Sequence, residues 1–179
     1  MVIKQSVPLM DSEKMRHALV AANLDVKRRA EPLRNENLLL LQRIGVEPEA
    51  QQFFAEFSFD EEEVEIGSFT YQQANCLKKN HDWEDDFQRA LQTNLLLVGS
   101  ALNGDLVVLD LIDYQAGILF HDHFWENEDE EPRKYLIKMQ CSLGELYWNS
   151  LNLKDYPIDA YEAAAYTGSA FTGYAEDED

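Results

Sequence analysis

The sequence has no long apolar run, few cysteines and few basic residues. No run approaches the roughly 18 to 20 apolar residues that a membrane-spanning helix needs. The N-terminal stretch has no apolar signal core, so we expect a cytoplasmic protein rather than an exported one. Cys76 and Cys141 stand far apart and outside any CxxC pair. In a cytosolic chain we expect both thiols to be reduced and partly buried, with a disulfide between them as the open alternative.

Signatures of catalysis are also missing. Ser100 lies in VGSAL, which is not a nucleophile elbow, and no His–Asp order around it suggests a triad. The glycines at 99, 104 and 117 are spaced as turn glycines rather than as a dinucleotide fingerprint. We therefore predict that the protein is not an enzyme.

Four aspartates lie in or near the apolar strands predicted below. A desolvated pair of carboxylates could perform acid–base chemistry. A chain this acidic also places carboxylates near one another by chance, and the Asp105 that follows Asn103-Gly104 is typical of a turn. We interpret these residues as structural: Asp105, Asp110, Asp113 and Asp122.

Two histidines are the best candidates for metal ligands. His121 and His123 are two residues apart in a predicted strand, so both would project from one face of it. A third ligand would have to come from His81, Cys76 or a carboxylate, and no spacing points to one. The alternative is a pair of ordinary histidines at a strand end. We expect no bound metal and no cofactor.

The charge is strongly negative and unevenly spread. Fifteen basic and 34 acidic residues give a net charge of −19 at pH 7. Residues 1–43 carry eight basic and five acidic side chains, and the remainder carries seven basic and 29 acidic. Such a field repels nucleic-acid phosphates and anionic membranes and speeds encounter with a basic partner. The alternative is an acidic surface that serves solubility alone.

Helix signals come first along the chain. Apolar residues at helical spacing predict a helix over 12–30, capped by Asp11 or Ser12. A second helix is predicted over 36–44, with Gly45 just beyond its end, and a third over 49–57 after Pro48. Residues 74–90 are ambiguous but compatible with a short helix. Ser142 and Glu145 have the spacing of a capping box, which predicts a helix over 142–151, and a short helix fits residues 160–166.

Strand signals fill the middle of the chain. Residues 64–71 alternate with period two and break phase at Gly67, which indicates a bulge or a tight turn. Apolar runs predict strands over 95–99, 106–111 and 117–124, and alternation predicts another within 133–140. We expect an α+β fold with an antiparallel or mixed sheet, covered on at least one face by the helices around Leu39, Phe54 and Tyr147.

The order of these motifs resembles that of SMI1/KNR4-like (SUKH) domains. The parts that carry the resemblance are a leading helix, LLLLQRIG, and an aromatic helix from Pro48 to Phe57. They continue with the Gly99-Ser100 and Asn103-Gly104-Asp105 turns, the strand LVVLDL, the strand from Gly117 to His123, and the helix that begins at Ser142. The similarity covers about residues 35–152. FSFDEEEVEIG, the acidic loop at 126–131 and the tail after residue 155 depart from the family pattern.

The resemblance implies a binding module and three segments: an extension over 1–34, the SMI1/KNR4-like domain over 35–152, and an acidic tail over 153–179. Bacterial members of the family are immunity proteins that neutralise a cognate toxin, and fungal members are scaffolds. The resemblance supplies no catalytic residue. The function expected from it is stoichiometric binding of a basic toxin domain such as a nuclease. The alternative is a scaffold or regulatory domain without a toxin partner.

Two acidic segments are the candidate sites for that partner. Both are dense in carboxylates and both flank predicted strands, where a rigid sheet would present them. Rim carboxylates chiefly set the rate of encounter, so nearby apolar contacts must supply the affinity. The candidate residues are Asp60, Glu61, Glu62 and Glu63 in the first segment, and Glu126, Glu128, Asp129, Glu130 and Glu131 in the second.

Overall fold

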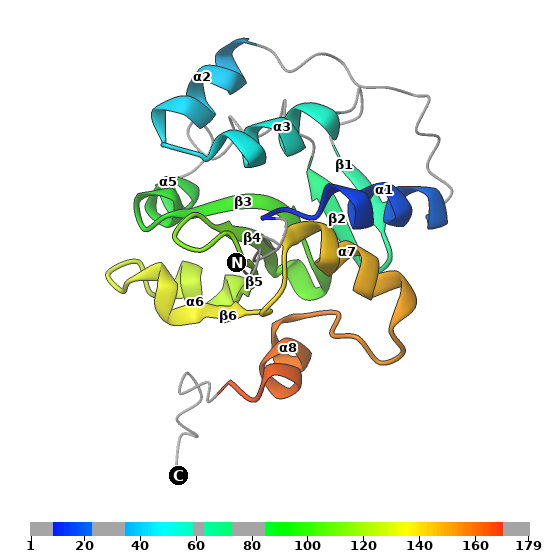
Figure 1. The fold of residues 1–179 in the computed structure, drawn as a ribbon. Helices are drawn as coiled ribbons and strands as arrows, with labels where there is room; N and C mark the ends of the chain where they lie inside the picture. The colour runs from blue at the N-terminus through cyan, green and yellow to red at the C-terminus, as the bar shows by residue number, and fades with distance from the viewer. Residues whose placement is uncertain (1–8, 23–34, 59–62, 73–84, 170–179) are drawn as a thin grey trace, which may run out of the picture.

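A six-stranded sheet forms the centre of the molecule (Figure 1). The computed structural model describes residues 9–22, 35–58, 63–72 and 85–169. All neighbouring strands are antiparallel, and their order in the sheet is their order in the chain. The predicted α+β class is confirmed, with an antiparallel rather than a mixed sheet. The strands are β1 (Glu63–Ile66), β2 (Phe69–Gln72), β3 (Leu95–Ser100), β4 (Leu106–Asp110), β5 (Ala116–Leu119) and β6 (Leu136–Lys138).

The helices precede, interrupt and follow the sheet. Two begin directly after the residues whose side chains predicted a cap: the Asp11 carboxylate accepts from the backbone N of Lys14, and the Ser142 hydroxyl accepts from that of Glu145. The part of the first predicted helix beyond residue 22 lies outside the described residues. The helices are α1 (Ser12–Ala21), α2 (Asn35–Arg43), α3 (Pro48–Glu56), α5 (Asp85–Gln92), α6 (His121–Glu126), α7 (Leu143–Asn152) and α8 (Ala160–Thr167), with 3-10 turns η2 (Leu102–Gly104) and η3 (Pro132–Tyr135).

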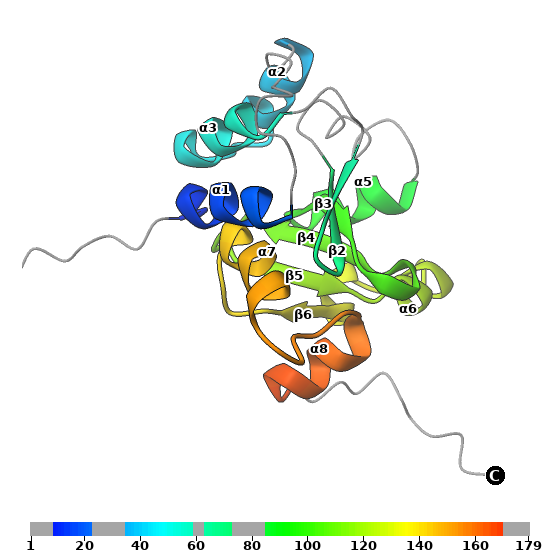
Figure 2. The ribbon, with the colours of Figure 1, turned by 90° about the vertical axis from the view of Figure 1, so that its right-hand side faces the viewer.

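Helices cover both faces of the sheet. Figure 2 shows α1 and α7 on one side and α5 and α6 on the other, with α8 beside β6. Every residue of β4 and β5 is buried, which explains why these strands are apolar runs without alternation. Phe54 and Tyr147 are buried as expected, whereas Leu39 is exposed and α2 buries its other side. Every helix in the described ranges is too short or too polar to cross a lipid bilayer.

The tight turn predicted at Gly67 is confirmed. Gly67 has φ +65° and joins β1 to β2, whose residues pair from Ile66 and Phe69 outward. The sheet also contains an irregularity between Leu97 and Gly99 in β3, where the register with β4 shifts. These two breaks let the meander turn while its apolar residues stay in the core.

The strand predicted over 117–124 is wrong in its second half. Leu119 is the last residue of β5 that pairs with β4 and β6, because it meets the end residues Leu106 and Leu136. The backbone N of His121 donates instead to the carboxylate of Asp105, and α6 begins there. The strand predicted within 133–140 is likewise shorter, since Pro132 opens a 3-10 turn before β6.

Residues from all three predicted segments contribute to one apolar core. Met10, Met15 and Leu19 come from the first segment, and Tyr156 and Ala160 come from the last. The backbone N of Gly144, at the start of α7, donates to the carbonyl of Met10 at 3.0 Å. This bond attaches residues 9–11, the segment just before α1, to α7. The division into an extension, a domain and a tail stays a prediction.

Candidate functional site

The second acidic segment lies at the end of α6 and in the loop that follows. Glu126 is the last residue of α6, and residues 127–131 connect it to η3. The side chains of Glu126, Glu128, Asp129 and Glu131 are exposed. The structure therefore places four of the five predicted carboxylates of this segment at the surface. We call these four residues the acidic loop.

Glu130 differs from its neighbours because its carboxylate holds the loop to η3. It accepts hydrogen bonds from the hydroxyl of Tyr135 and from Nζ of Lys134, the second at 2.9 Å. These hydrogen bonds lower the pKa of Glu130. Burial and the hydrogen bond to Glu130 raise the pKa of Tyr135 to about 12. Glu130 is thus a structural residue of the loop rather than a free carboxylate on its surface.

An arginine fixes the other end of the acidic loop. The guanidinium of Arg89, on α5, donates to the backbone carbonyls of Phe124 and Asn127. It also lies 4.6 Å from the centroid of the Phe124 ring. Because these contacts engage the end of α6, they attach the loop to the helix that packs against β3. The contacts of Arg89 therefore fix the end of α6 from which the exposed carboxylates of the acidic loop project.

Three large apolar side chains are exposed on α6, η2 and α8, and one of them, Trp125, directly precedes Glu126 of the acidic loop. Trp125 is 41% exposed on α6, Leu102 is 50% exposed on η2, and Tyr161 is 52% exposed on α8. The Trp125 ring meets the ring of His121 edge to face at 5.3 Å, and Tyr161 meets Phe120 in the same way at 5.1 Å. We call Leu102, Trp125 and Tyr161 the aromatic face, after the two aromatic rings among its three apolar side chains. Such exposed groups supply the affinity of many protein interfaces.

A buried carboxylate joins the three segments that carry the aromatic face. Asp105 follows η2, and its Oδ1 accepts from the backbone N of His121 at 3.2 Å and from Nδ1 of the same residue at 3.0 Å. Its Oδ2 accepts from the backbone N of Ala160 at 2.8 Å, at the start of α8. The interpretation of Asp105 as a turn residue was incomplete, because its side chain is buried and positions α6 and α8.

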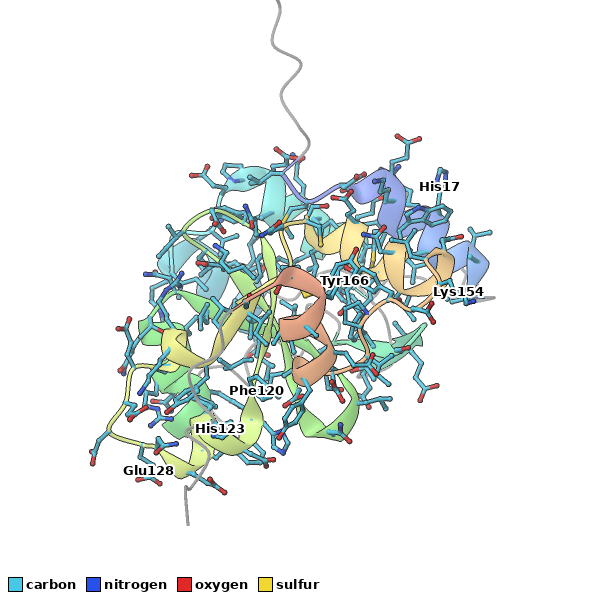
Figure 3. All side chains as sticks on the ribbon, turned by 90° about the horizontal axis from the view of Figure 1, so that it is seen from below. His17, Phe120, His123, Glu128, Lys154 and Tyr166 are labelled. Atoms are coloured by element: carbon cyan, nitrogen blue, oxygen red, sulfur yellow. The ribbon has the colours of Figure 1, made fainter. Side chains whose placement is uncertain are left out.

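The stretches that contain η2, α6 and α8 lack lysine and arginine. Residues 90–132 and 155–169 contain neither, although they contain twelve aspartates and glutamates. The view from below shows Phe120 near the end of α8 that lies away from Tyr166, with His123 farther from that helix and Glu128 farther still, at the edge of the molecule (Figure 3). The nearby Arg89 and Lys134 are bound to the loop itself.

The first acidic segment is placed only in part. Asp60, Glu61 and Glu62 lie outside the described residues. Glu63 is exposed and begins β1, where it pairs with Gln72. The sheet order puts β1 at one edge, whereas the acidic loop lies between β5 and β6 at the other. The structure thus does not bring Glu63 together with the second segment.

The prediction that His121 and His123 project from one face is wrong, because both lie on α6 rather than on a strand. The His121 ring lies between carboxylates, with Nδ1 facing Asp105 and Nε2 at 2.8 Å from Asp122. The His123 ring stacks on Tyr135 with centroids 5.7 Å apart. Within the described ranges, no group of three or more His, Cys, Asp or Glu is arranged to hold a metal ion. His81 and Cys76 lie outside those ranges.

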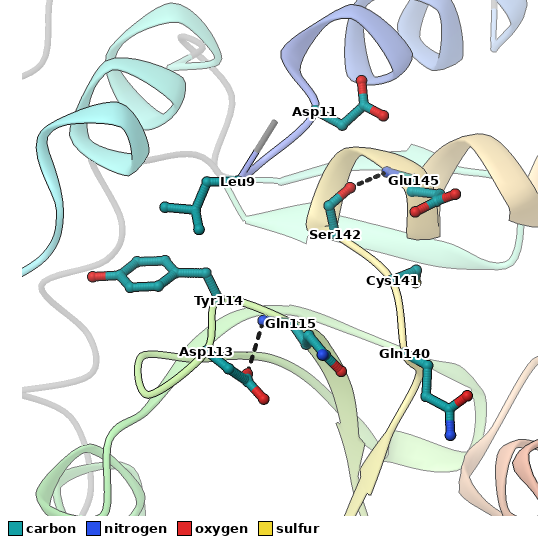
Figure 4. A pocket seen from close by; sticks show the side chains of 9 residues that line it. All are labelled: Leu9, Asp11, Asp113, Tyr114, Gln115, Gln140, Cys141, Ser142 and Glu145. Carbon is teal, nitrogen blue, oxygen red and sulfur yellow. Dashed lines mark hydrogen bonds between the residues drawn. The ribbon is translucent and has the colours of Figure 1, made fainter. Parts of the chain in front are cut away.

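A pocket of about 280 Å³ lies between the segment just before α1, the β4–β5 turn and the start of α7 (Figure 4). Its three acidic side chains have cationic partners: Lys14 bonds Glu145 at 3.0 Å and lies 3.9 Å from Asp11, and Lys138 bonds Asp113. These contacts hold the pocket walls together and leave little charge for a ligand. Its full lining is Leu9, Asp11, Asp113, Tyr114, Gln115, Gln140, Cys141, Ser142 and Glu145.

Asp110 is the centre of a buried ion cluster at the end of β4. Its carboxylate accepts two hydrogen bonds from the guanidinium of Arg133, at 3.0 and 2.5 Å, and one from Nζ of Lys138 at 2.9 Å. Burial opposes ionisation, but the bonds from Arg133 and Lys138 outweigh it and lower the pKa of Asp110 to about 2. With every charge in it paired, this cluster stabilises the β4–β5–β6 region and offers no reactive group.

Comparisons with family models, with curated proteins and with solved structures find no match to this chain. The resemblance to SMI1/KNR4-like domains therefore stays a prediction that depends on the residues quoted for it. The function has to be inferred from the surface itself.

Sequence reasoning missed the aromatic face and the role of Asp105. Trp125 and Tyr161 are 36 residues apart in the chain, so no local pattern connects them. One signal was available: residues 90–132 and the segment from 155 onward share the absence of lysine and arginine. Two stretches that both lack basic side chains can form one acidic surface where the fold brings them together.

Proposed function

We propose that this protein is a protein-binding module, and specifically an immunity protein that neutralises a cognate bacterial toxin by stoichiometric binding. The observation that carries the proposal is the aromatic face, of which Trp125 directly precedes the acidic loop, on segments that contain no lysine or arginine. Exposed Trp and Tyr side chains ringed by charges of one sign are typical of an interface that selects a partner of the opposite charge.

The charge of the surface supports a basic partner. A nuclease holds phosphates with lysine and arginine, so its active site is a basic surface. An inhibitor that covers such a site gains from carboxylates, which also speed the encounter. The acidic loop supplies four exposed carboxylates. The same charges oppose direct binding of nucleic acid and of anionic membranes.

The support of the surface favours binding without a large rearrangement. Arg89 fixes the end of α6, Glu130 attaches the loop to η3, and Asp105 joins the starts of α6 and α8. A surface held in this way loses little conformational entropy when a partner binds.

The proposal is tested with the product of the adjacent gene. The two proteins are co-expressed, and the stoichiometry of the purified complex is measured by light scattering. We expect an equimolar complex and loss of the toxic activity of the partner in cells. A protein that forms no complex with an adjacent toxin, and leaves its activity intact, would instead support a scaffold or regulatory domain without a toxin partner.

A matched pair of variants locates the binding surface. The neutralised-loop variant changes the four residues of the acidic loop to Gln or Asn and keeps Glu130. The remote-acid variant makes the same change at four exposed acidic residues on other elements, Glu13, Glu47, Glu49 and Glu65. We expect weaker binding from the first variant and nearly unchanged binding from the second. Equal effects of the two would show that net charge, not this surface, attracts the partner.

A further inference from the structure

Trp125 has carboxylates on both sides of it in α6. Asp122 lies one helical turn before it and Glu126 directly follows it, and both side chains are exposed. The carboxylate of Asp122 lies 2.8 Å from Nε2 of His121 and is still 65% exposed. The same His121 ring meets Trp125 at an interplanar angle of 86°. His121 thus contacts both Asp122 and the indole, and holds them on one side of the helix.

The opposite side of α6 shows how this helix accommodates a guanidinium. Arg89 lies over the Phe124 ring at 4.6 Å and donates to the carbonyls of Phe124 and Asn127. One aromatic ring and oxygen acceptors near its edge satisfy the flat cation and its N–H donors. Trp125 with Asp122 and Glu126 offers the same two kinds of group at the surface, with carboxylates as acceptors.

We propose that Trp125, Asp122 and Glu126 form a site for an arginine side chain of the basic partner. This inference rests on the proposed function and names the side chain that the surface selects. Arginine fits better than lysine because its planar guanidinium stacks on an indole and donates in its plane to carboxylates, whereas an ammonium is a compact, strongly hydrated charge. Residues 90–132, which include all three residues of the site, contain no lysine or arginine.

Two synthetic peptides test the selectivity. One alternates glycine with arginine and the other alternates glycine with lysine, so their charge and length are equal. Binding to the full chain is measured by calorimetry at low ionic strength. We expect the arginine peptide to bind about two- to fivefold more tightly, the ratio that an exposed cation–π contact supplies.

Variants connect this preference to Trp125. Trp125→Leu removes the ring and keeps an apolar side chain, and we expect it to bind both peptides equally. Trp125→Phe restores a ring and is expected to recover part of the preference. Tyr166→Leu is the control, since it removes an aromatic ring that is 55% exposed at the far end of α8. We expect that control to keep the full preference.

The outcomes separate this inference from the proposed function. Equal binding of the two peptides by the unaltered protein, or a preference that survives in Trp125→Leu, would overturn the arginine site. The proposed function is decided independently by the complex with the adjacent gene product. If that complex forms while no arginine preference exists, the proposed function stands and this inference fails.

Discussion

Oδ1 of Asp105 lies 3.0 Å from Nδ1 of His121, and the same carboxylate also binds the backbone N of His121 and of Ala160. One buried side chain therefore satisfies three donors at the first residues of two helices. Trp125 follows one of these N-termini and Tyr161 the other. The arrangement of the aromatic face depends on a residue that a partner need not touch.

Replacing Asp105 is expected to destabilise the protein. Asp105→Ala leaves three donors without their acceptor in a buried place, and we expect the free energy of unfolding to fall by about 2–4 kcal/mol. Asp105→Asn keeps one acceptor oxygen and should lose less. Urea denaturation measures both changes. An Asp105→Ala variant as stable as the unaltered protein would contradict this account of the carboxylate.

The lowered pKa of Asp110 predicts a loss of stability in acid. Because the folded state holds this pKa at about 2, below the value of an unfolded aspartate near 4, the folded state favours the ionised form. The contribution is complete above about pH 4 and is lost as the pH falls to about 2. We expect it to amount to about 1–2 kcal/mol.

Denaturation across that pH range provides the measurement. The variant Asp110→Asn should be less stable near neutral pH, because Arg133 and Lys138 lose their anion. Its stability should also fall less steeply between about pH 4 and pH 2 than that of the unaltered protein. Parallel curves for the two proteins would show that Asp110 does not contribute to acid denaturation.

Gly144 is expected to tolerate no side chain. A Cβ at this position would lie 2.0 Å from the carbonyl oxygen of Asp11. The segment just before α1 would therefore have to move away from α7. We expect Gly144→Ala to lower the free energy of unfolding by about 2–3 kcal/mol. The comparison is Ser142→Ala, which removes only the cap of the same helix and should cost about 1 kcal/mol. A smaller effect at Gly144 than at Ser142 would contradict the close approach.

The thiol of Cys141 is expected to be unreactive in the folded protein. Burial raises its pKa to about 12, so almost no thiolate is present near pH 8. In a Cys76→Ser background, a thiol-specific reagent should modify Cys141 only after denaturation. Rapid modification of the folded protein at a rate close to that of the denatured chain would show that the residue is accessible.

Much of the fold could be predicted from local patterns. Ser142 and Asp11 marked helix starts correctly because a capping hydroxyl or carboxylate acts on the next few residues. Gly67 marked a turn for a similar reason. The helix at His121 was missed because the strand indicated by the apolar residues 118–120 was extended to Phe124, whereas the end of that strand is decided by where its pairing with β4 and β6 stops.

The candidate site was predictable only in its charge. The acidic loop is a local run of residues and was found. Glu130 could not be separated from its neighbours, because its role depends on the distance to Tyr135 across the turn. Trp125 and Tyr161 belong to two helices whose first residues, His121 and Ala160, both bind Asp105, and these partners are 16 and 55 positions from it in the chain. Contacts of this range leave no periodic signal.

The most direct test of the central claim is the rate at which the protein associates with the adjacent gene product as salt is varied. The Debye length falls from about 30 Å at 0.01 M to about 8 Å at 0.15 M salt, so steering by the acidic loop should weaken over that range. For the unaltered protein, we expect the association rate to fall by about tenfold or more over that range. The neutralised-loop variant should associate slowly at every salt concentration and depend less on salt. The remote-acid variant should behave like the unaltered protein. A partner that is itself acidic, or a rate indifferent to salt and to the loop charges, would contradict the account.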